Sequence, residues 1–184
     1  LRRIGISLPS KAENLQAGLA FDIVSTLSNP NVTTGHLNGV ITVNLEEADD
    51  TYRQINRQQL GENSRTLLGH FRHEVGHYYF YRLIGTNAGY LQRFNDLFGD
   101  PDADYQEALD RHYSEGAPPG WKQNYVSSYA TMHPAEDWAE TFAHYLHLVD
   151  TAETAAAYGL KVAPDVDEAG ALSAEVAFDA YRVR

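Results

Sequence analysis

The sequence predicts an α+β fold in which a small mixed sheet packs on a helical lobe. A short β-branched segment at 40–45 lies between a glycine and two acidic residues, which is typical of a strand. Apolar residues recur at helical spacing over two longer segments, 64–84 and 135–149. The chain has 184 residues, of which 43% are hydrophobic, so it can bury the core of one globular domain spanning 1–184.

The sheet is expected in the first part of the chain, residues 1–62. In chain order we expect a short helix at 11–16, a strand at 19–24, loops at 29–31 and 35–39, the strand at 40–45 and an exposed helix at 49–60.

The helical lobe is expected at 63–184. Its first helix, at 64–84, can be capped by Asn63 or Ser64 and ends at Gly85. It is followed by helices at 90–98 and 103–112, a loop at 114–120, a helix at 135–149 that Pro134 opens and 151–157 continues, a loop at 159–170 and a last helix at 173–181.

The helix at 64–84 is apolar, yet it carries four polar side chains, and buried polar groups need partners. His73 and His77 are four residues apart, about 40° around the helix axis, so their rings point to one side. Two such rings suit a tetrahedral zinc ion. Glu74 lies beside them and can take a proton from a metal-bound water. His70, one turn earlier, either lines the same site or is a hydrogen-bonded packing histidine. Gly76 costs the helix roughly 1 kcal/mol relative to alanine, which indicates a close approach to its backbone.

A third ligand is expected from a later helix. The chain has no cysteine. In the extended zinc motif HExxHxxGxxH a glycine and a third histidine follow, and this chain has Phe80 and Leu83 at those two positions. Glu136 and Glu140 are four residues apart and face the same way, so one can bind zinc while the other accepts the ring N–H of a ligand histidine. Asp137 is a rival ligand that points about 100° away from Glu136.

These two segments resemble the gluzincin metallopeptidases, and most closely the family described as putative zinc-binding metallopeptidases. Residues 73–77 read HEVGH, and residues 134–147 read PAEDWAETFAHYLH. The family patterns are HExGH and P-x-E-D-W-A-E-T-x-A-H-Y-L-H. The resemblance covers about residues 19–156 and implies a zincin-like fold with the active-site cleft between sheet and helical lobe. Members of this family often carry a four-cysteine zinc ribbon upstream, which has no counterpart in this sequence.

A wider resemblance is to the catalytic domain of anthrax lethal factor, in which a tyrosine lies seven residues before the glutamate ligand. The resemblance implies that Glu136 is the third ligand and that Glu140 is the carboxylate behind a ligand histidine. It also implies that Tyr129 donates to the oxyanion, with Tyr125 as the alternative.

We therefore expect one Zn²⁺ per chain and a hydrolase that cleaves peptide or protein substrates, with Glu74 as the general base. Two other classes stay open: a zinc hydrolase of a non-peptide amide, and a catalytically silent, metal-stabilised binding domain. The silent class needs a fourth protein ligand such as His70 or His133, and the presence of Glu74 argues against it. His133 is otherwise a candidate to touch substrate.

Composition bears on partners and location. Lys and Arg number 14 and Asp and Glu 25, so the net charge is −11, which argues against a nucleic-acid partner. No apolar run approaches the roughly 18 residues of a membrane span. The chain begins at Leu1 without a signal-like leader, and the expected location is the cytoplasm.

Overall fold

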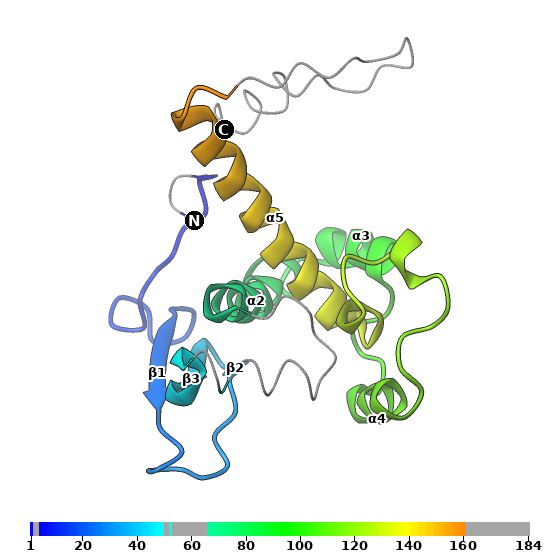
Figure 1. Ribbon diagram of the computed structural model, residues 1–184, viewed down its shortest axis with the longest axis horizontal. Coiled ribbons are helices and arrows are strands. Elements are labelled where there is room, and N and C mark those ends of the chain that lie inside the picture. The colour runs from blue at the N-terminus through cyan, green and yellow to red at the C-terminus, as the bar shows by residue number, and fades with distance from the viewer. Residues whose placement is uncertain (2–3, 50–51, 53–65, 161–184) are drawn as a thin grey trace. The chain divides into compact units, whose positions relative to one another are not determined.

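The computed structural model describes residue 1, residues 4–49, residue 52 and residues 66–160. The chain divides into two compact units, Pro9–His144 and a second unit of Leu1–Leu8 with the chain from Tyr145 onward. The fold is α+β, as predicted, with a three-stranded mixed sheet and helices labelled α2 to α5 (Figure 1). The organisation as a single domain stays a prediction.

The sheet has three strands, β1 (Ala20–Val24), β2 (Gly35–Leu37) and β3 (Val40–Asn44), in the order β1-β3-β2. β1 runs parallel to β3 and β2 runs antiparallel to it. The strands expected at 19–24 and 40–45 are confirmed to within one residue. Ile41 and Val43 on β3 are buried, as alternate residues on one face of a strand should be.

The loop expected at 35–39 is wrong, because this segment contains β2 and the turn of a two-residue hairpin. Asn38 and Gly39 have φ values of 51° and 76°, and positive φ at both central residues defines the turn that best matches strand twist. The register pairs Leu37 with Val40 across this turn. An Asn-Gly pair beside a β-branched run is the signal that predicts such a hairpin.

The short helix expected at 11–16 is also wrong, since the segment forms two turns. The Asn14 side chain accepts a hydrogen bond from the Ala17 N–H at 2.8 Å, and such a local bond competes with helix formation. The helix expected at 49–60 lies outside the described residues apart from Asp49 and Tyr52.

Helix α2 (Leu67–Tyr79) is capped by Thr66, whose hydroxyl accepts from the Gly69 N–H at 2.9 Å. Asn63 and Ser64, the expected caps, lie outside the described residues, and the helix begins three residues later than expected. After Tyr79 the chain continues as a π-helix, η3 (Phe80–Ile84), and ends at Gly85 as predicted.

The remaining expected helices are confirmed as α3 (Ala88–Phe98), α4 (Tyr105–Glu115) and α5 (Pro134–Ala157). Asn87 and Asp104 cap the first two through their side chains. The loop expected at 114–120 begins later, because α4 extends to Glu115 and Gly116 is its C-cap. The expectations for 159–170 and 173–181 lie outside the described residues beyond Leu160. Short 3₁₀ turns complete the chain: η2 (Leu45–Ala48), η4 (Trp121–Gln123) and η5 (Tyr129–Thr131).

The sheet is fastened to α2 by polar and aromatic contacts. The Tyr78 hydroxyl and Arg82 guanidinium both donate to the Ala17 carbonyl, at 2.7 and 2.6 Å. The His36 ring on β2 meets the Tyr78 ring edge-on, with centroids 6.0 Å apart. Strand β2 therefore lies directly beside the helix that carries the HEVGH segment.

Helices α2 and α5 approach each other closely at Gly76, in keeping with the expectation from the sequence. A Cβ at residue 76 would lie 3.0 Å from the Ala139 Cα and 3.3 Å from the Phe142 Cβ. The Trp138 indole N–H donates to the Gly76 carbonyl at 2.8 Å, and the Tyr79 and Phe142 rings stack at 5.7 Å. These contacts fix which residues of the two helices face each other.

Replacing Gly76 by alanine should destabilise the protein. Overpacking of this kind costs about 1–3 kcal/mol, and alanine's better helix propensity returns only up to about 1 kcal/mol. Gly89→Ala is the control, because a Cβ there meets only the Asn87 Oδ1 at 3.4 Å. Urea unfolding should show a loss for Gly76→Ala and none for Gly89→Ala; equal stabilities would disprove the tight contact.

Candidate metal centre

Three side chains from α2 and α5 converge on one point. His73 Nε2 lies 3.0 Å from His77 Nε2 and 3.0 Å from Glu136 Oε2. His77 Nε2 lies 3.4 Å from Glu136 Oε1. Within the described part of the chain, this is the group of three His, Cys, Asp or Glu residues whose ligand atoms come within 4.8 Å of one another.

The donor set fits a zinc ion. Zinc–nitrogen and zinc–oxygen bonds of about 2.0–2.2 Å place tetrahedral ligand atoms about 3.3 Å apart, close to the three separations in the structure. Two imidazole nitrogens 3.0 Å apart repel each other through their lone pairs unless a proton or a cation lies between them. Two histidines and a carboxylate form a set of three protein ligands, which is the number that catalytic zinc sites use.

Glu140 lies behind the first histidine. Its Oε1 is 2.7 Å from His73 Nδ1, so Nδ1 carries a hydrogen, and Nε2 is the ring nitrogen that faces Glu136 and His77. The Ser127 hydroxyl also hydrogen-bonds Glu140. A carboxylate in this position fixes both the tautomer and the ring orientation of a histidine ligand.

The charges of the group are strongly coupled. Burial by itself lowers the pKa of His73, but the hydrogen bonds and charges of Glu136 and Glu140 outweigh it and raise the pKa to about 10. Burial raises the pKa of Glu136, whereas His73 and His77 hold it well below its usual range. A metal ion that binds here must therefore displace a proton from His73.

Glu74 is 7% exposed, and among the described residues its carboxylate has no hydrogen-bond partner. The Glu74 charge acts on Tyr105. Burial raises the pKa of Tyr105 most, followed by the charge of Glu136, and the charge of Glu74 raises it further. Glu74 therefore faces the same region as Tyr105 and Glu136.

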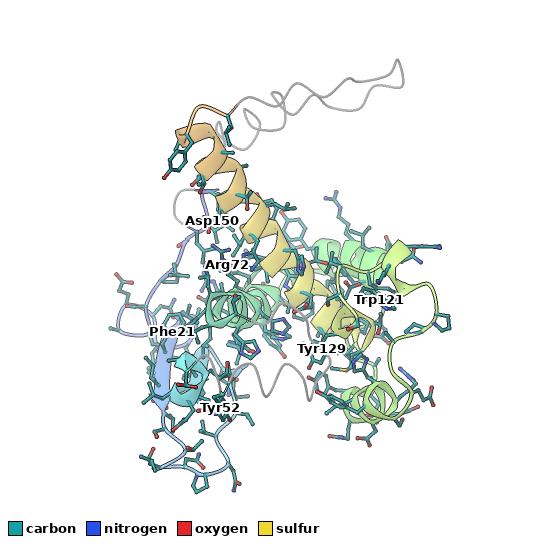
Figure 2. The ribbon with its side chains drawn as sticks, viewed as in Figure 1. Phe21, Tyr52, Arg72, Trp121, Tyr129 and Asp150 are labelled. Carbon is teal, nitrogen blue, oxygen red and sulfur yellow. The ribbon has the colours of Figure 1, made fainter. Side chains whose placement is uncertain are left out.

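Tyr129 lies beside the first turn of α5 (Figure 2). Its ring centroid is 6.2 Å from that of His73. Burial, followed by the charge of Glu136, raises the pKa of Tyr129 far above its usual range, so the hydroxyl keeps its proton and can donate. Tyr125, the alternative donor, is exposed.

Tyr105 was not singled out by the sequence, although it reaches the centre directly. Its hydroxyl donates to Glu136 Oε1 at 3.1 Å. Tyr105 begins α4 and lies 31 residues from Glu136, so no local spacing pattern connects the two.

The other candidate ligands are engaged elsewhere. The Asp137 carboxylate accepts from the Thr141 hydroxyl at 3.4 Å, and burial raises its pKa to about 6. Both nitrogens of His133 are used: Nδ1 accepts from the Ala135 N–H and Nε2 donates to the Ala103 carbonyl, each at 3.1 Å.

His70 is a hydrogen-bonded packing histidine. Its Nδ1 lies 2.5 Å from Glu47 Oε2, and the Thr34 hydroxyl donates to the other oxygen of Glu47 at 2.8 Å. This buried network joins α2 to the segment around the sheet.

An α+β fold with a two-histidine, one-glutamate centre on neighbouring helices defines a candidate metalloprotein of the catalytic-site type. The chain belongs to the family described as "Putative zinc-binding metallo-peptidase", whose model matches residues 1–183.

Relatives include uncharacterized protein Mb2598c of Mycobacterium bovis and uncharacterized protein Rv2568c of Mycobacterium tuberculosis. Each is 58% identical over 160 residues, which make up 87% of this chain and 47% of the relative. The chain thus spans about half the length of the curated relatives it matches. No solved structure matches. None of the helices in the described part of the chain has the length and apolar character needed to cross a membrane.

Zinc binding should release the His73 proton. Because the pKa of His73 is about 10 without metal, the ring is protonated at pH 7–8 and must lose that proton to bind. Zinc affinity should rise about tenfold per pH unit between pH 6 and 9. Titration calorimetry in two buffers of different ionisation enthalpy measures the release. Binding heats that do not depend on the buffer would contradict proton release. The variant Glu140→Gln removes one of the two carboxylate charges that raise the pKa of His73, so it should release fewer protons on binding zinc.

Proposed function

We propose that this chain is a zinc-dependent metallopeptidase of the gluzincin type that hydrolyses peptide bonds. His73, His77 and Glu136 would hold one zinc ion. The observation that carries the proposal is the convergence of these three donors on one point, with Glu74 next to His73 on α2. When bound, zinc supplies a Lewis acid that polarises the scissile carbonyl and lowers the pKa of a coordinated water to about 7.

Glu74 acts as the general base. Its carboxylate accepts a proton from the water that attacks the scissile carbonyl carbon, then delivers that proton to the leaving amine nitrogen. Since no described residue hydrogen-bonds this carboxylate, both of its oxygens are available for the transfer.

Tyr129 stabilises the developing oxyanion. Its hydroxyl remains protonated because burial raises its pKa, and it lies on the side of His73 that faces Glu136 and Tyr105. A donor aimed at the charge that develops in the transition state is among the largest contributions an active site makes.

The engagement of His70 and His133 supports an open site rather than a closed, silent one. His70 pairs with Glu47, and His133 uses both nitrogens on the backbone. Among the described residues, neither belongs to the group whose ligand atoms lie within 4.8 Å of one another, so a coordination position is left for water or substrate. Cleavage of a peptide library, set against a panel of small amides, separates a peptidase from an amidase.

The substrate would lie extended along β2, which is an edge of the sheet and packs beside α2. In a two-residue hairpin the residues flanking the turn bond to each other, so the next residue, His36, turns its N–H and C=O outward. An extended peptide can add to those groups as a further strand.

Glu74→Gln should keep zinc and lose activity. The amide has the shape of the carboxylate but cannot accept the proton, so kcat/KM should fall roughly 10²- to 10⁴-fold. Elemental mass spectrometry should find about one zinc per chain in this variant and in the exposed control Glu115→Gln. His77→Ala and Glu136→Ala should lose the metal. An active Glu74→Gln variant, or zinc retained after both ligand replacements, would refute the assignment.

His36→Pro should impair cleavage more than His36→Ala. Both variants lose the imidazole, which accepts from the Gly39 N–H at 3.0 Å, but only proline removes the outward backbone N–H. The loss of one hydrogen bond predicts a kcat/KM roughly fivefold lower for proline than for alanine. Equal rates in a peptide assay would exclude strand pairing at this edge.

A further inference from the structure

We infer that Tyr105 is a positioning residue for the metal ligand Glu136: its hydroxyl holds one carboxylate oxygen, so that the other is directed at the ion. The inference rests on the proposed zinc site. It concerns a residue on α4, a helix that contributes none of the three donors.

The two oxygens of Glu136 have different surroundings. Oε2 lies 3.0 Å from His73 Nε2. Oε1 accepts from the Tyr105 hydroxyl at 3.1 Å and lies further from His77 Nε2, at 3.4 Å. A carboxylate with one oxygen occupied by a donor offers the other as a single ligand atom, whereas an unrestrained carboxylate can bind through both.

Tyr105 is itself held in place from α5. The His133 ring packs against the Tyr105 ring with centroids 5.2 Å apart. His133 also bonds the Ala103 carbonyl, two residues before Tyr105, while capping the Ala135 N–H. One imidazole thereby ties the start of α4 to the turn of α5 that carries Glu136.

The position of the proton sets the direction of this bond. The Tyr105 hydroxyl has a single proton, and it donates that proton to the Glu136 carboxylate. Tyr105 thus orients the ligand.

A purely structural role predicts something different. Tyr105 is 44% exposed, so removing its hydroxyl should leave the fold intact. The ring contact with His133 is unaffected in a phenylalanine variant. Any change in metal binding then arises from the lost bond to Glu136.

The test compares Tyr105→Phe with Tyr90→Phe, an exposed tyrosine on α3. Zinc affinity is measured by competition with a chromophoric chelator, and the geometry by the visible spectrum of the cobalt(II) protein. Tyr105→Phe should bind zinc about 10- to 100-fold more weakly, and its cobalt bands should weaken as a second carboxylate oxygen joins the ion. Tyr90→Phe should match the wild type in both.

Unchanged affinity and spectrum in Tyr105→Phe, with one ion bound by the wild type, would overturn the inference alone. A wild-type chain that takes up neither zinc nor cobalt would instead overturn the proposed function. If Tyr105→Phe does not fold, His133→Asn keeps a residue that can cap α5 but removes the ring beside Tyr105. Its zinc affinity should also fall, and an unchanged affinity would count against the inference.

Discussion

The close contact between α2 and α5 at Gly76 is the constraint on which the rest of the site depends. A ligand set drawn from two helices works only if the helices have a fixed separation and a fixed register. The bare Cα of Gly76 sets the separation against Ala139, and the Trp138 bond to the Gly76 carbonyl sets the register. Because these contacts lie one turn or less from His73, His77 and Glu136, an error in packing becomes an error in metal geometry.

The charged side chains buried at the metal centre are paired with one another. His73 lies between two carboxylates, Glu136 on one ring nitrogen and Glu140 on the other. Each charged group therefore has an opposite partner, which buried charges require.

The sequence predicted those parts of the fold and site that depend on local spacing. The HEVGH segment and the pair Glu136 and Glu140 each follow helical geometry, so their shared faces could be read from their numbers. Tyr105 could not be found in this way, because its contact with Glu136 arises from how α4 meets α5 in three dimensions. The β2 hairpin carried a readable Asn-Gly signal, and was missed because the strand before it has only three residues.

The π-helical segment after α2 determines where the end of that helix points. A π turn contains one residue more than an α turn, and Phe80–Ile84 adopts it just after the metal-binding turns. The extra residue rotates everything beyond it by about 100°, which brings Arg82 to the Ala17 carbonyl beside the sheet. If the same residues continued as a regular α-helix, the HEVGH segment would be intact, yet Arg82 would be turned by about 100° from its observed position. The π geometry of this segment therefore sets the phase between the zinc-binding turns and the sheet, independently of any side chain at the centre.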